Sequence, residues 1–359
     1  MKGTCIAPTG ATATRYGEKP RYPEGLYDLG EGVFAWLVPN GSWGEANAGL
    51  ITGTGASLLV DTLWDPGKTR VMLDAMEPLL AGAPLAAVVN THADGDHFWG
   101  NQCLPHTPKL TTIRARAEMD HHRPKSMIAF QRTGRVLAMM PRKNLRIAGR
   151  YFSAMCQPYD FASVIHSPAE KTFSGELVLH IGGREVRLIE VGPAHTSGDL
   201  MVHVPDAKLL FAADIVFIGS TPVMWAGPLD NLLAALDRIL DLDVTTIIPG
   251  HGPVTDKDGV RSVKRYWLYV AEAARAAFDA GTPPERAAAQ IAHGSGLRER
   301  GFAHWDSPER MMTNVHLLYR HWSGREAPLG IPEKFNLMRK QALLAHSLPD
   351  ATPALMHRL

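Results

Sequence analysis

The chain has 359 residues, of which 45% are hydrophobic and 20% are charged, and its formal net charge is +1 with the histidines neutral. This composition is that of a globular protein able to bury a substantial core without disulfides. The near-neutral charge argues against nucleic acid or an anionic membrane surface as a partner.

Cysteine usage and the lack of long apolar segments favour a cytoplasmic protein. Cys5, Cys103 and Cys156 are widely spaced and form no Cys-x-x-Cys pair, so we expect no disulfide framework. Residues 1–10 lack the basic start and apolar core of a secretory signal. No stretch approaches the roughly 18 apolar residues that span a bilayer. A homodimer is compatible with the sequence.

The first part of the chain predicts short strands followed by a βαβ unit. Residues 1–22 show no periodicity and indicate an irregular N-terminal arm. An amphipathic helix at 67–81 lies between two apolar strands, so we expect the loop after the second strand at the carboxyl end of a parallel pair. The strands predicted in this part are 33–38, 48–51, 57–61 and 85–89.

Helices are expected both within and after the strand-rich region, which we place at residues 23–255. Residues 114–170 hold helix-like runs and predict a helical insertion that caps the site. His121 and His122 lie in it, and a structural or surface role is the prediction for both. Residues 256–359 predict a helical C-terminal extension. Further strands are expected at 176–181, 186–190, 200–204, 209–211 and 245–248.

The stretch Asn90–His97 predicts a catalytic metal site. Four metal-capable side chains, His92, Asp94, Asp96 and His97, fall within six residues directly after an apolar strand. Such a loop holds imidazoles and carboxylates with little freedom, as a catalytic metal requires. The alternative is a polar turn rich in Asp and His, which Gly95 would also suit.

Four further residues of the same kind follow other predicted strands. They are Asp61, His195 in Ala-His-Thr-Ser-Gly, Asp214, and His251 in Pro-Gly-His-Gly. With the His/Asp stretch they reproduce, in order, the motifs of a known family. Over roughly residues 25–255 the chain resembles the metallo-β-lactamase fold superfamily. The resemblance implies a four-layer αβ/βα sandwich, to which we add the helical insertion and the C-terminal extension.

The resemblance also implies two divalent metal ions in one site. It assigns His92, Asp94 and His195 to the first metal, and Asp96, His97 and His251 to the second. Asp214 would bridge them, and Asp61 would orient a ligand from behind. Asp94 departs from the family motif, which has His at that position. A carboxylate there shifts metal preference from Zn²⁺ toward Mn²⁺ or Fe without excluding zinc.

We expect the protein to be a metal-dependent hydrolase that uses hydroxide, formed between two metals, on a small organic substrate. Asp96 would orient the hydroxide and accept a proton. An ester, lactone, thioester or activated halide would fit. Trp43 and Trp225 are expected to line the pocket. The alternative, kept open by Asp94, is an iron-dependent oxidoreductase that resembles the persulfide dioxygenase or diiron branches of the superfamily.

Overall fold

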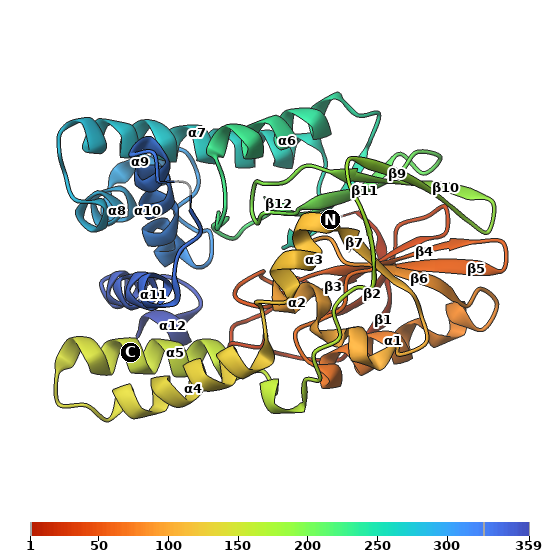
Figure 1. Cartoon of the computed structure of the whole chain (residues 1–359), viewed down its shortest axis with the longest axis horizontal. Coiled ribbons are helices and arrows are strands. Elements are labelled where there is room, and N and C mark those ends of the chain that lie inside the picture. Colours follow the sequence, from red (N-terminus) through yellow and green to blue (C-terminus); the bar gives the residue numbers. More distant parts are fainter. Residues whose placement is uncertain (1, 326, 359) are drawn as a thin grey trace.

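The computed structural model describes residues 2–325 and 327–358. Within these ranges two mixed β-sheets pack on one another (Figure 1). The first has eight strands in the order β1 to β8, and the second has five in the order β13-β12-β11-β10-β9. Their bounds are β1 (Thr4–Pro8), β2 (Gly25–Asp28), β3 (Val33–Leu37), β4 (Ala48–Gly53), β5 (Ala56–Val60), β6 (Leu85–Val89), β7 (Lys109–Thr112), β8 (Lys171–Phe173), β9 (Glu176–Ile181), β10 (Arg184–Glu190), β11 (Leu200–Val204), β12 (Leu209–Phe217) and β13 (Thr246–His251).

Apolar side chains fill the space between the sheets and beneath the helices on both outer faces. Val89 of the first sheet and Val202 of the second belong to one buried cluster between them. The outer face of the first sheet is covered by α1 (Pro66–Leu80). The outer face of the second is covered by α6 (Leu229–Asp241) and α7 (Lys257–Asp279). These four layers confirm the predicted αβ/βα sandwich.

The predicted βαβ unit is present and leads into the polar loop. The N-cap residue of α1, Asp65, accepts a hydrogen bond from the backbone N–H of Lys68 at 2.9 Å. After this helix the chain returns as β6, which pairs in parallel with β5. The loop that follows Val89 therefore lies at the carboxyl end of this parallel pair.

A helical insertion separates β7 from β8, which pair in parallel. It contains α3 (Ile113–Met119), α4 (Pro124–Ala138), α5 (Lys143–Cys156) and the short 3-10 helix η2 (Phe161–Ser163). Helices α4 and α5 form a hairpin that extends away from the sheets and packs against the C-terminal helices (Figure 1). Phe152 of α5 has its ring centroid 4.2 Å from that of Phe130 and 5.6 Å from that of Phe335.

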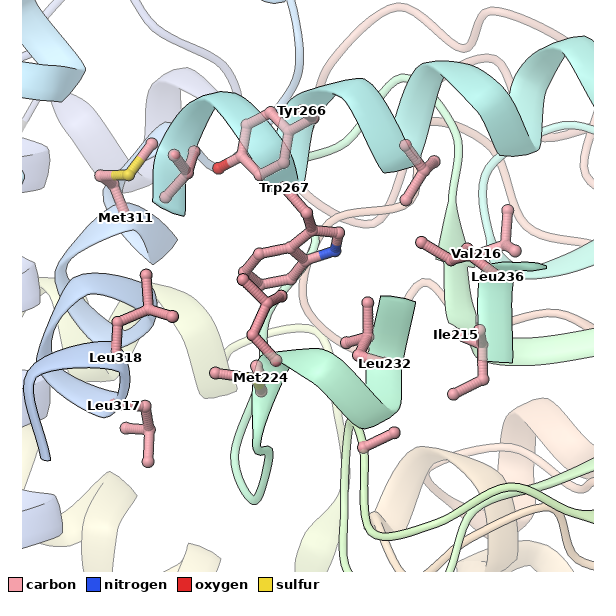
Figure 2. Packing of buried hydrophobic residues seen from close by; sticks show 14 of the residues in the cluster. Ile215, Val216, Met224, Leu232, Leu236, Tyr266, Trp267, Met311, Leu317 and Leu318 are labelled. Atoms are coloured by element: carbon pink, nitrogen blue, oxygen red, sulfur yellow. The ribbon is translucent and has the colours of Figure 1, made fainter. Parts of the chain in front are cut away.

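The C-terminal helices are built onto the sandwich through a shared core. Trp267 of α7 is fully buried and packs among Met224, Leu232 and Leu318 (Figure 2). Leu318 comes from α10, so helices after residue 255 and the sandwich bury the same cluster. The elements that follow α7 are α8 (Pro284–His293), α9 (Ser295–Glu299), η3 (Pro308–Arg310), α10 (Met311–Trp322), α11 (Ile331–His346) and α12 (Ala354–His357), and α2 (Gly95–Phe98) and η1 (Trp99–Cys103) follow β6. No helix in the described ranges is long and apolar enough to cross a membrane.

The expectation of an irregular arm over residues 1–22 is wrong at residues 4–8. These residues form β1, which pairs antiparallel with β2 at the edge of the first sheet. All five are exposed or half-buried, so backbone hydrogen bonds place the strand and no run of buried side chains reveals it in the sequence. The short strands β7 and β8 were likewise not predicted.

Candidate metal centre

The loop after β6 is fixed by buried polar contacts and close packing. The side-chain amide of Asn90 donates to the carbonyl of His97 at 3.0 Å. Gly95 opens the short helix α2 (Gly95–Phe98), and a Cβ at this position would lie 2.7 Å from the ring of Trp99. The ring of Trp99 therefore leaves room only for glycine at position 95, and glycine also suits a turn. The His and Asp side chains around Gly95 are held in place.

The other ligand-type residues come from the second sheet. His195 lies in the loop between β10 and β11, which Asp199 closes by accepting hydrogen bonds from the backbone of the same loop. Asp214 lies within β12, and His251 ends the adjacent parallel strand β13. The residue before this histidine has to be glycine, because a Cβ at Gly250 would lie 1.8 Å from Asp214 Oδ1. Asp214 in β12 and His251 at the end of β13 thereby come within 3.4 Å of each other.

The residues assigned to a first metal meet at one point. His195 Nε2 lies 3.2 Å from Asp94 Oδ2 and 3.3 Å from Asp214 Oδ2. His92 Nε2 lies 3.9 Å from each of the same two oxygens. Tetrahedral ligands about 2.0 Å from one zinc ion are separated by roughly 3.3 Å. The spacing of these four side chains fits such an ion.

The residues assigned to a second metal meet beside them. His97 Nε2 lies 3.3 Å from Asp214 Oδ1 and 3.9 Å from Asp96 Oδ2. His251 Nε2 lies 3.6 Å from Asp96 Oδ2 and 3.4 Å from Asp214 Oδ2. The carboxylate of Asp214 thus contacts both groups, as a bridging ligand must.

Buried polar atoms without partners show that the residues fit metal ions. Nε2 of His92, Nε2 of His97 and Oδ1 of Asp214 are buried and have no hydrogen-bond partner among the described residues. Leaving such atoms unpaired is costly, and coordination to a cation satisfies them. The ligand atoms within each of the three groups of His and Asp in this site lie within 4.8 Å of one another.

Asp61 turns two imidazoles toward the centre. Its Oδ2 lies 2.9 Å from His97 Nδ1 and accepts a hydrogen bond from the hydroxyl of Thr91 at 2.7 Å. The same hydroxyl lies 3.0 Å from His92 Nδ1, which donates to it. With both Nδ1 atoms protonated, both Nε2 lone pairs are free for a metal. Asp61 has a φ of 62°, so this buried residue adopts a strained backbone conformation at the site.

Neighbouring carboxylates favour protonated histidines when no cation is present. Burial lowers the pKa of His97, but the charges of Asp214 and Asp61 outweigh burial and raise it to about 10. Burial also opposes the charge on His195, whereas Asp214 and Asp94 raise its pKa to about 10. Since a metal must displace these protons, binding at neutral pH is coupled to proton release.

His122 is a site residue that the sequence reasoning missed. Its Nδ1 lies 3.1 Å from the carbonyl of Ala93, to which it donates, and 3.5 Å from Asp94 Oδ1. Glu118, one turn earlier, accepts hydrogen bonds from the backbone and hydroxyl of Ser197 in the His195 loop. The start of the insertion therefore braces two residues of the first metal position. Helix α3 ends at Met119, so His122 lies just beyond it and the local sequence gives no signal for its approach to Asp94, whereas His121 beside it is exposed.

Trp43 and Trp225 lie together beside the centre. Their ring centroids are 6.4 Å apart, and both side chains are half-buried. The backbone N–H of Trp225 donates to the carbonyl of His195 at 2.8 Å, and His195 Nδ1 donates to the carbonyl of Val223 at 2.7 Å. The segment that carries Trp225 therefore also orients a metal-ligand candidate.

The C-terminal extension holds Trp43 in place. Its indole N–H donates to Glu309 Oε1 at 3.2 Å, and the guanidinium carbon of Arg310 lies 4.6 Å from the ring centroid. Glu309 is fully buried and lies 3.1 Å from His357 Nε2. A cation over an indole ring is attracted to it. This contribution from distant helices had no signal in the sequence near Trp43.

The fold and the ligand set together define a metal-dependent hydrolase: His and Asp from two sheets converge in buried clusters typical of a binuclear site. The chain belongs to the metallo-beta-lactamase superfamily, whose sequence profile matches residues 41–251, more than half of the chain.

Individual relatives match part of the chain. The 2,4-dinitroanisole O-demethylase subunit alpha of Nocardioides sp. (strain JS1661) is 26% identical over 233 residues, 63% of this chain and 55% of that protein. The hydroxyacylglutathione hydrolase of Rhizobium meliloti (strain 1021) is 41% identical over 188 residues, 52% of this chain and 55% of that protein. The chain thus spans about 55% of the length of both curated relatives. The sec-alkylsulfatase Pisa1 from Pseudomonas sp. shares the fold at a TM-score of 0.60 and 17% identity, over 86% of this chain and 52% of that protein.

Proposed function

We propose that the protein hydrolyses a small thioester with the help of two divalent cations, both of which we expect to be Zn²⁺. The observation that carries the proposal is the position of Asp214, whose oxygens lie 3.3 Å from both His195 Nε2 and His97 Nε2. When bound there, a pair of cations lowers the pKa of water between them and polarises the substrate carbonyl. Cys103 and Cys156 are poor candidates for the nucleophile, because burial raises the pKa of both thiols.

Asp96 is the residue to which we assign proton transfer. Burial raises the pKa of Asp96, and the negative charges of Asp214 and Asp94 raise it further. His97 and His251 lower the pKa of Asp96 but do not outweigh these effects. A carboxylate with a raised pKa accepts a proton from the attacking water more readily and can return it to the leaving thiolate. Asp61 is a positioning residue, since it acts through His97.

The proposed substrate class rests on the two neighbouring indoles and on the relatives. Trp43 and Trp225 offer an apolar, half-buried surface suited to a small acyl group. One relative is a hydroxyacylglutathione hydrolase, which names a glutathione thioester as its substrate. A thioester also has a good leaving group, so attack by activated water needs little further assistance.

A substrate and metal screen tests the proposal. The protein is purified without chelator, analysed for metal, and assayed with acyl-glutathione and acyl-coenzyme A thioesters, aryl esters, lactones and aryl methyl ethers. We expect zinc or manganese and the fastest turnover on a thioester. Faster turnover of another class with these metals would overturn the thioester assignment and leave the hydrolase.

The oxidoreductase alternative draws on one observation, the carboxylate of Asp94 beside His195 at the first metal position. Abundant iron together with O₂ consumption, and no hydrolysis of any of these substrates, would favour it over the hydrolase. The same purified sample serves for both measurements.

A further inference from the structure

A strongly basic segment lies outside the candidate metal centre. Residues 121–159 contain eight Lys or Arg residues and no Asp or Glu, although the net charge of the whole chain is only +1. They are Arg123, Lys125, Arg132, Arg135, Arg142, Lys143, Arg146 and Arg150. None of the eight forms an ion pair with any residue that the structure describes, whereas most other parts of the chain mix both signs of charge.

The hairpin of α4 and α5 presents these cations on its outer surface. Lys125, Ala129, Arg132, Val136 and Met139 follow one another at intervals of three or four residues and are all exposed, so they form one stripe along α4. The opposite face of the helix packs on α5. Cationic and apolar side chains thus alternate along a face that no other element covers.

Two further features lie on this stripe. Lys125, Ile128, Ala129, Arg132 and Thr133, all on α4, line a shallow and open depression of the surface. At the turn between the helices, Val136, Met139 and Met140 are 49%, 79% and 37% exposed. The hairpin turn lies at the periphery of the molecule, away from both sheets (Figure 1).

We propose that the outer face of α4 and the α4–α5 turn bind an anionic phospholipid surface. Lys and Arg close to an anionic bilayer are attracted to its headgroups, and exposed Met and Val side chains enter the boundary with the acyl chains. Nucleic acid would match the cations but would place Met139 against phosphates. A second copy of the chain would bring two cationic faces together, which is repulsive.

The proposal goes beyond the hydrolase activity and concerns a different surface. Whole-chain net charge argued against an anionic membrane, but it averages over acidic residues located elsewhere. The local balance of the hairpin, eight cations to no carboxylate over residues 121–159, is what a lipid headgroup would meet. The contact is peripheral and needs no spanning segment.

Co-sedimentation of the full chain with vesicles tests this surface. Vesicles of equal parts phosphatidylglycerol and phosphatidylcholine are compared with vesicles of phosphatidylcholine alone. We expect binding only to the anionic vesicles, weakened by salt. Each cation contributes on the order of fivefold to partitioning. The triple variant Arg132→Glu, Arg135→Glu and Arg142→Glu removes three cations and adds three carboxylates, so it should bind at least on the order of 100-fold more weakly.

Two further variants decide the origin of any binding. Lys171→Glu, Arg265→Glu and Arg298→Glu change the charge equally at exposed positions on other elements and should leave most binding intact. Met139→Ser with Met140→Ser should reduce binding at high salt more than at low salt. Failure of the wild-type chain to sediment with anionic vesicles overturns the proposal. Equal loss in both charge variants overturns it too, because binding would then follow net charge alone.

Discussion

Asp94 Oδ2 lies 3.2 Å from His195 Nε2, within the group of side chains that we assign to a first metal, where the sequence resemblance expects an imidazole. A carboxylate is a harder ligand than imidazole and shifts the metal preference toward Mn²⁺ or Fe without excluding zinc. We expect Asp94→His to keep the fold and to raise the share of zinc when the protein is loaded from an equal mixture of metals. Unchanged selectivity by elemental analysis would show that Asp94 does not touch a metal.

We assign His97 to the second metal, since its Nε2 has no hydrogen-bond partner among the described residues and lies 3.3 Å from Asp214 Oδ1. We expect His97→Ala to abolish hydrolysis and to lower the metal content by about one ion per chain. His180→Ala, a change on the exposed face of β9, serves as the control and should alter neither quantity. Full activity in the His97 variant would rule out the binuclear assignment.

Asp61 accepts hydrogen bonds at both oxygens, from the backbone N–H of Thr91 and from His97 Nδ1. In Asp61→Asn an amide nitrogen, which cannot accept a hydrogen bond, replaces one carboxylate oxygen. The tautomer of His97 is then no longer fixed. Residues of this kind contribute about 10–100-fold to metal affinity. We expect a loss of that size in competition with a chromogenic chelator, with little change in the far-UV circular dichroism.

His122 and His121 form a matched pair, since only the first contacts the ligand loop. His122→Ala removes a donor to the carbonyl of Ala93 and a neighbour of Asp94. We expect His122→Ala to lose the more weakly bound of its two metal ions at a lower chelator concentration than the wild type does. His121→Ala should behave as wild type. Equal effects of the two changes would assign the loss to general destabilisation.

The buried carboxyl of Glu45 is expected to make the free energy of unfolding decline as the pH rises. Burial raises the pKa of Glu45 from its usual 4.5 to about 8, against the opposing effects of Ser42 and Arg15. The folded chain therefore keeps a proton that the unfolded chain releases, and stability declines as the pH rises between these values. Glu45→Gln keeps an acceptor for the backbone N–H of Ser42 and removes this proton exchange. We expect a smaller decline in its urea-unfolding free energy between about pH 4.5 and about pH 8, and equal slopes would contradict the assignment.

The sequence was informative where periodicity and spacing report directly on structure. The apolar run 85–89 followed by His and Asp predicts a strand that ends in ligands, and the structure brings all seven ligand-type residues to one centre. It was uninformative where contacts join distant segments. Nothing near Trp43 predicts that Glu309 would hold its indole, and nothing near His122 predicts its approach to Asp94. Edge strand β1 was missed because backbone pairing leaves no apolar pattern.

Glu309 and Arg310, which belong to the C-terminal extension, hold Trp43 in place. The metal-ligand candidates lie in the sandwich, while the far end of the chain holds Trp43, which we expect to contact the substrate. We therefore expect substitutions in the last hundred residues to change substrate selectivity without altering any ligand candidate. Directed evolution of selectivity should begin there.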